Sequence, residues 1–252
     1  MSGRIARLSL SALRMAAAHR QAEPGELARF LYRFGTVPRS PAIERDFGPD
    51  DDPMGVLSLT SGGQARRILD TVFNATSFDG WYSFSRVPAD ARLQSVCKLY
   101  VSPRPEALAD AFPRIAAVFA ESGVRSFKVG RGIEGLLRPD KIVAYFEDQA
   151  HQADVAAAVI QALTGCPAQG VPFTNEIGGD GIVSAGVDPP AGDTPTSWRA
   201  CVTERLASAV SASPAMDVED RVSAALEGIR AAGIDPFSWT LINDAFGPSG
   251  LS

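Results

Sequence analysis

The segment that most constrains the fold of this chain is an amphipathic stretch between residues 105 and 122. Its apolar residues recur at helical spacing: Leu108, Phe112, Ile115, Ala116 and Phe119. Gly123 follows directly and is typical of a helix end. Residues 93–102 and 125–130, on either side, are predicted to form strands. A helix with one apolar face must cover an apolar surface, so we expect it to lie against a sheet.

The rest of the chain completes this picture. Further helices are predicted for residues 9–22, 26–34, 64–73, 149–163, 197–209 and 217–232, and further strands for 141–146 and within 171–188. Residues 36–53 hold four prolines and three consecutive aspartates and are expected to form a loop, and the aromatic residues 77–88 a hairpin arm. The order of elements predicts an α+β fold with a mainly antiparallel sheet and helices packed on one face.

Composition narrows the functional classes. A formal net charge of −5 lacks the basic field of a nucleic-acid-binding protein. The three cysteines, Cys97, Cys166 and Cys201, form no close pair in sequence, which fits a reducing compartment, and only two histidines argue against a zinc site. No run approaches the ~18 consecutive apolar residues of a membrane helix. We therefore expect a cytoplasmic protein with neither a nucleic-acid nor a membrane partner.

Two lysines stand out on predicted strands. Lys98, Tyr100 and Ser102 share one face of their strand, whereas Leu99 and Val101 point to the other. A half-exposed strand with a solvated lysine would explain this pattern equally well. A second lysine, 128, lies between two apolar residues in a short strand, where lysine is rarely buried without a partner or a task. We expect the two lysines to lie on neighbouring strands.

Three arginines accompany them at the ends of predicted elements. Arg131 lies between two glycines after the second strand, Arg138 precedes the strand that begins at Lys141, and Arg199 falls in the first turn of a helix. Each has a simpler explanation: a surface arginine on a turn, a structural pair with Asp140, and a solvated side chain. Together with the lysines they predict a pocket for a dianion, because guanidinium groups bind phosphate oxygens in pairs.

The order of these segments resembles a known family. The segments are Lys98-Leu-Tyr-Val-Ser102, a helix, Phe127-Lys-Val-Gly130, Arg138 and Ile142-Val-Ala-Tyr145. Effector phosphothreonine lyases carry Lys-Phe-His-Ile-Ser, a helix, Trp-Lys-Val-Thr, an arginine and Phe-Thr-Leu-Tyr. The arrangement is also similar to the lyase domains of class III and IV lanthipeptide synthetases and to HopA-type lyase subunits of class V lanthipeptide and thioamitide pathways. Pieces similar to the last group are Pro172-Phe-Thr174, Asp188-Pro189 and Ser197-Trp-Arg199.

The resemblance covers residues 93–206 and implies a phospholyase-like core at 76–212, between an N-terminal helical region with the Pro-rich loop (1–75) and a C-terminal helical extension (213–252). It implies that Lys128 is the base that removes an α-proton and that Lys98, Arg138 and Arg199 hold the phosphate. The histidine of the family, the acid on the leaving phosphate, is replaced by Tyr100. Tyr100 or Lys98 then serves the leaving group, or the protein is no longer catalytic.

The chemistry is consistent with these roles. A free lysine, with a pKa of ~10.4, is protonated at neutral pH and is no base. Burial and nearby cations depress a lysine pKa toward the ~7–8 that suits catalysis, and the same cations stabilise a departing phosphate. The scheme requires no metal or cofactor. Its substrate is a phosphorylated precursor peptide, which becomes dehydroalanine or dehydrobutyrine, and a separate kinase is needed because the chain has no kinase motif.

Other readings fit less well. There is no Gly-x-Ser-x-Gly elbow of a serine hydrolase and no phosphate-binding loop, since the glycine-rich segment at 178–181 lacks the lysine. His151 is predicted to lie on a helix surface. The principal alternative is a non-catalytic subunit that binds a peptide or a kinase in a peptide-modification complex.

Overall fold

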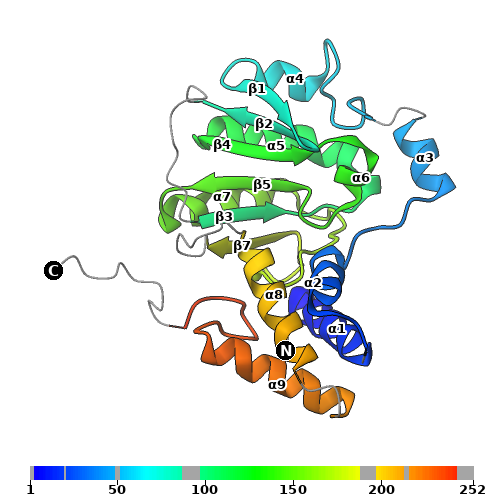
Figure 1. Ribbon diagram of the computed structural model, residues 1–252. Helices are drawn as coiled ribbons and strands as arrows, with labels where there is room; N and C mark the ends of the chain where they lie inside the picture. The colour runs from blue at the N-terminus through cyan, green and yellow to red at the C-terminus, as the bar shows by residue number, and fades with distance from the viewer. Residues whose placement is uncertain are drawn as a thin grey trace.

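The computed structural model describes residues 3–19, 21–48, 52–86, 97–187, 197–212 and 216–242 (Figure 1). Its helices are α1 (Arg4–Ala18), α2 (Pro24–Arg33), α3 (Pro41–Phe47), α4 (Gln64–Leu69), α5 (Leu108–Glu121), α6 (Gly132–Leu137), α7 (Gln149–Ala162), α8 (Trp198–Ser211) and α9 (Val218–Ala231). A 3₁₀ turn, Pro105–Ala107, leads into α5. In this part of the chain, no helix has the length and apolar character needed to cross a membrane.

The strands form one sheet. They are β1 (Asn74–Phe78), β2 (Trp81–Ser85), β3 (Cys97–Val101), β4 (Ser126–Gly130), β5 (Ile142–Phe146), β6 (Asn175–Ile177) and β7 (Val183–Val187). In the described residues their order is β1-β2-β4-β5-β3-β7-β6, and every pairing is antiparallel. The predicted α+β class with a mainly antiparallel sheet is confirmed.

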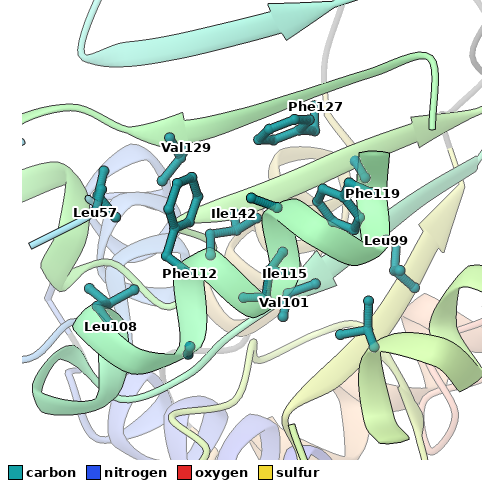
Figure 2. Close-up of a cluster of buried hydrophobic side chains, with 14 of the residues drawn as sticks. Leu57, Leu99, Val101, Leu108, Phe112, Ile115, Phe119, Phe127, Val129 and Ile142 are labelled. Carbon is teal, nitrogen blue, oxygen red and sulfur yellow. The ribbon is translucent and has the colours of Figure 1, made fainter. Parts of the chain in front are cut away.

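One face of the sheet is apolar and is covered by helices. Figure 2 shows Phe112, Ile115 and Phe119 of α5 beside side chains of β3, β4 and β5, and all of them belong to one buried cluster. The predicted amphipathic helix therefore packs as expected. Burial of such side chains contributes roughly 1.5–3 kcal/mol each to folding.

A second buried cluster joins α1, α2, α8 and α9, which Figure 1 shows together below the β7 end of the sheet. The buried Arg221 connects helices of this bundle through hydrogen bonds. Its guanidinium donates to the carbonyl oxygens of Ala17 and Val210, near the ends of α1 and α8. A buried guanidinium is tolerated because it satisfies carbonyls that helix ends leave unpaired.

Several element predictions need correction. Residues 36–53 were expected to be a loop but contain α3, which Ser40 caps by accepting a hydrogen bond from the Ile43 amide, with Pro41 at the first helical position. The helix expected at 9–22 begins at Arg4 and ends at Ala18, and the one at 64–73 ends at Leu69. Helix α6 was not predicted. The predicted hairpin exists as β1–β2, and β2 also pairs with β4.

Some predicted segments extend beyond the residues that the structure describes. Residues 93–96 of the first predicted strand and Asp188-Pro189 lie outside the described residues, as do 87–88 of the hairpin arm. The remaining predicted helices and strands are present with ends that differ by a few residues: α2, β3, α5, β4, β5, α7, the β6–β7 pair, α8 and α9.

Candidate functional site

The two predicted lysines lie on the face of the sheet opposite α5. The prediction that they lie on neighbouring strands is wrong, because β5 lies between β3 and β4. Lys98 pairs with Tyr145 of β5, and Lys128 pairs with Val143 of the same strand. Directly paired residues of antiparallel strands point to the same face. Both lysines therefore lie on the same face of the sheet, on either side of β5. The predicted division into an apolar and a cationic face is confirmed.

Aromatic rings line the space between the lysines. The ammonium nitrogen of Lys128 lies 4.0 Å from the centre of the Trp81 ring and 5.9 Å from that of Tyr145. Lys98 approaches the other side of the site, with its Nζ 5.5 Å from the Tyr145 ring centre. Both ammonium groups thus converge on Tyr145, within the distance at which a ring attracts a cation.

A small cleft of about 40 Å³ opens at this point. Its lining residues are Tyr32, Trp81, Lys98, Tyr100, Lys128, Asp140, Val143, Tyr145, Ser197 and Arg199. We call it the lysine cleft. It brings together residues from β2, β3, β4, β5, α2 and the start of α8, which are far apart in sequence.

Tyr100, which stands where the lyase motif that the sequence resembles has histidine, is almost fully buried in the lysine cleft. Burial raises the pKa of its phenol well above the ordinary value, against the opposing charge of Arg199, so Tyr100 keeps its proton at neutral pH. Gly186, opposite Lys98 on β7, makes room for it: a Cβ there would lie 2.9 Å from the Trp198 ring and 3.2 Å from the Tyr100 ring. The Tyr100 ring is thus packed closely, with its phenol protonated.

Arg138 and Arg199 meet at a carboxylate. Arg138 donates two hydrogen bonds of 2.9 Å to the two oxygens of Asp140, and Nη1 of Arg199 lies 2.8 Å from Oδ2 without the alignment of a hydrogen bond. Burial opposes the charge of Asp140, but the nearby charges of Arg199 and Arg138 outweigh it and hold the pKa of this carboxyl well below its usual range. The structural pair considered for Arg138 and Asp140 is therefore present, with Arg199 as a third member.

Arg199 lies in the first turn of α8, as predicted, but it is buried and not solvated. Its Nε donates to the Pro172 carbonyl at 3.2 Å and its Nη2 to the Tyr32 carbonyl at 2.6 Å. The neighbouring Trp198 donates from Nε1 to the Phe173 carbonyl at 3.1 Å. The carbonyl groups of Pro172 and Phe173 therefore hold the start of α8 in place.

Two of the predicted phosphate ligands, Arg131 and Arg138, do not line the lysine cleft. Arg138 lies beside it, with its guanidinium 5.0 Å from the centre of the Trp81 ring. The Nε of Arg131 forms an ion pair of 2.9 Å with Asp52 at a half-exposed position. Six residues of the lining were not predicted as site residues: Tyr32, Trp81, Asp140, Val143, Tyr145 and Ser197. Trp81 falls in the segment predicted as a hairpin arm, and nothing near Tyr32 on its helix indicates that its hydroxyl contacts Asp140. The resemblance did include Tyr145, which was a usable signal.

His151, predicted on a helix surface, is half-buried on α7, where its Nε2 lies 2.7 Å from the Ser122 carbonyl oxygen. It belongs to the opposite side of the sheet from the lysine cleft, since its ring contacts Phe146 of the apolar cluster.

Comparison with known proteins identifies structures with a similar fold but does not identify a family. No protein-family model matches the chain, and no curated protein matches its sequence. The effector protein from Pseudomonas syringae pv. tomato strain DC3000 has a TM-score of 0.55 and 13% identity over 94% of this chain and 98% of its own. The effector protein from Pseudomonas syringae pv. syringae strain 61 has a TM-score of 0.51 and 14% identity over 94% and 99%.

At such identities these two structures show the fold alone, which this chain shares along nearly its whole length. The phosphothreonine lyase OspF from Shigella flexneri is a weaker match, with a TM-score of 0.39 and 14% identity over 48% of this chain and 75% of its own.

Proposed function

We propose that this protein is a carbon–oxygen lyase that eliminates phosphate from phosphoserine or phosphothreonine in a ribosomally made precursor peptide. The products are dehydroalanine and dehydrobutyrine, and a separate kinase supplies the phosphorylated residue. The observation that carries the proposal is the convergence of Lys98, Lys128 and Arg199 on one small aromatic cleft, with Arg138 beside it. A cluster of cations against buried rings suits a dianion that departs from a carbon chain.

In the proposed reaction the neutral amine of Lys128 takes the α-proton of the phosphorylated residue. The electron pair of the broken C–H bond forms the Cα–Cβ double bond while the Cβ–O bond breaks, and phosphate leaves with that oxygen. Lys98 and the two arginines stabilise the departing charge. Tyr100 donates a hydrogen bond to a phosphate oxygen.

Asp140 serves as a positioning residue in this scheme. It occupies Nε and Nη2 of Arg138, and its attraction holds Nη1 of Arg199 nearby. Each guanidinium has five N–H groups in a rigid fork, so donors remain for a phosphate after these contacts. Tyr32 supports the group, because its hydroxyl donates to Asp140 at 3.2 Å.

The test is to incubate the protein with a phosphothreonine and a phosphoserine peptide. Elimination releases phosphate and leaves an alkene that adds a thiol, whereas a phosphatase would leave a hydroxyl group that does not. We expect Lys128→Ala to lower the rate by about 10²–10⁴-fold, the usual contribution of a general base. Arg125→Ala is the matched control, since Arg125 precedes the same strand but forms an exposed ion pair with Glu147.

Full activity of Lys128→Ala would remove that lysine from the role of base. Tyr100→Phe and Tyr100→His separate the roles left open for the leaving group: loss in the first and recovery in the second assign it to Tyr100. If both retain activity and Lys98→Ala does not, Lys98 serves the phosphate.

A second candidate function is a subunit that binds a phosphorylated peptide or a kinase without catalysis. It is favoured by one observation, the phenol in place of the family histidine, because a tyrosine whose pKa is raised by burial gives up its proton reluctantly. Phosphate-dependent peptide binding with no released phosphate, in the wild-type protein and in Tyr100→His alike, would support this candidate over the lyase.

A further inference from the structure

A larger cleft of about 700 Å³ opens beside the lysine cleft. Tyr32 and Asp140 line both, so the two spaces share a boundary. Two groups of elements supply the rest of its lining: α2 with α8, and α6 with the β1–β2 turn. Its volume falls in the ~300–1,000 Å³ range of binding sites. We call it the flanking cleft. Arg138, which the proposed elimination uses, lies in its lining together with the supporting residues Tyr32 and Asp140.

The charge of the flanking cleft differs from that of the lysine cleft. Its lining holds four arginines and four carboxylates, whereas the lysine cleft has three cations and one carboxylate. Two of the four arginines already form ion pairs, Arg131 with Asp52 and Arg138 with Asp140. A balanced lining of this kind does not favour a second phosphate. It suits a ligand that carries both signs of charge, such as a peptide.

The side of α2 and α8 keeps an excess of positive charge, because Arg29 and Arg33 outnumber Glu204 of α8, whereas the side of α6 and the β1–β2 turn keeps two carboxylates. Arg29 and Arg33 lie one turn apart on α2, whereas Asp79 is in the β1–β2 turn and Glu134 on α6. These five side chains, Glu204 included, are available to a ligand, since within the described residues none of them forms an ion pair. Residues four apart on a helix share one face, so the two guanidinium groups act together on an anionic side chain.

We propose that the flanking cleft receives the residues beside the phosphorylated residue of a peptide, and that Arg29 and Arg33 select an acidic side chain there. The proposal rests on the proposed function, which places the phosphorylated residue in the lysine cleft. A chain that leaves that cleft past Tyr32 and Asp140 enters the flanking cleft directly. A basic side chain of the same peptide faces Asp79 and Glu134. The substrate class is therefore a phosphopeptide with a charged flank that is acidic toward α2.

The test uses fluorescent peptides in which a phosphonate analogue, with carbon in place of the ester oxygen, replaces phosphothreonine and cannot be eliminated. Glu and Lys are compared at each flanking position, and binding is followed by fluorescence anisotropy. We expect wild-type protein to prefer Glu at one position by about five-fold, the size of one or two exposed ion pairs. The double variant Arg29→Glu/Arg33→Glu should reverse that preference.

Two controls make the result specific. Arg205→Glu alters an equally exposed arginine of α8 that lines neither cleft and should leave the preference unchanged. A blocked single phosphonate residue without flanks should bind wild type and the double variant equally. An unchanged preference in the double variant, or an equal change in Arg205→Glu, would overturn the inference. Because binding is measured without elimination, failure of the lyase activity appears separately, as phosphopeptides that stay intact.

Discussion

Successive side chains of strand β4 point to opposite faces of the sheet and lie in two different environments. Phe127 points into the apolar cluster, where its ring stacks on Phe84 with centres 4.7 Å apart and contacts Phe119 at 5.0 Å. The next residue, Lys128, points to the opposite face and lies over Trp81. Its partner strand β5 repeats this division, and so does β3, which pairs with β5.

The difference shows how the molecule separates stability from chemistry. The apolar face buries large side chains against α5 and supplies the free energy that holds the strands in register. The opposite face holds cations close together, which costs free energy unless a ligand or a carboxylate such as Asp140 compensates them. The strands can hold such an arrangement because their other side is firmly packed.

The largest expected effect is on the free energy of unfolding, and it tests the division between the apolar and the cationic face. Phe127→Ala should lower the free energy of unfolding by about 3–5 kcal/mol, since it removes a fully buried ring and leaves a cavity. Lys128→Ala, one residue further, should change the free energy of unfolding by less than about 1 kcal/mol. Urea denaturation followed by circular dichroism measures both. Equal losses in the two variants would mean that Lys128 is a structural residue.

The two faces were also predictable to different degrees. Alternation within 97–102 and 125–130 is a local signal, and it correctly assigned which residues share a face. The order of strands is not local: β5 follows both lysine strands in the chain yet lies between them. Sequence reasoning therefore placed the lysines on neighbouring strands and did not see Tyr145 as the ring that separates them.

The short elements and the buried charges were missed for related reasons. Helices α3 and α6 have only seven and six residues, too few for a periodic pattern to emerge. The local sequence around Arg199 is that of an ordinary capped helix, so its burial depends on Tyr32 and Pro172, which approach from other parts of the chain. Asp140 appeared only as a turn partner of Arg138, because its second arginine is distant in sequence.

The second expected effect is a pH dependence of stability that comes from a lysine outside the cationic face. Lys141 is completely buried, with its Nζ 2.9 Å from the Pro103 carbonyl oxygen and 2.6 Å from Oε1 of Gln169. Burial lowers the pKa of Lys141 to about 7, against smaller opposing effects of Asp140 and Glu106. The folded protein thus binds this proton less tightly than the unfolded chain does, whose lysine pKa is ~10.4.

Stability should therefore rise with pH between about 7 and 10.4, because the unfolded chain retains a proton that the folded protein has lost. From pH 7 to pH 9 this lysine should add about 2 kcal/mol to the free energy of unfolding. Urea denaturation at a series of pH values measures the slope, and Lys141→Met should flatten it. A wild-type slope no steeper than that of the variant would mean that Lys141 stays protonated in the folded protein.

The smallest effect concerns the edge of the apolar face, where Tyr82 of β2 reaches Asp52. The Tyr82 hydroxyl donates to this carboxylate, which also accepts from Arg131 Nε at 2.9 Å and from the Gly132 amide at 3.3 Å. Burial and then the hydrogen bond to Asp52 raise the pKa of Tyr82 to about 12. The stabilisation is present below the ordinary tyrosine pKa of ~10 and is lost as the pH rises through 12.

Asp52→Asn should lower the pKa of Tyr82 toward ~10 and reduce the free energy of unfolding at neutral pH by under about 1 kcal/mol, since the group is partly exposed to solvent. Ultraviolet titration of phenolate formation measures the pKa, and the difference from Tyr82→Phe assigns the signal. Elimination should continue in Asp52→Asn if Arg131 is only part of this edge contact. A loss of phosphopeptide turnover would instead show that Asp52 holds Arg131 in place for the substrate, and would extend the functional face beyond the lysine cleft.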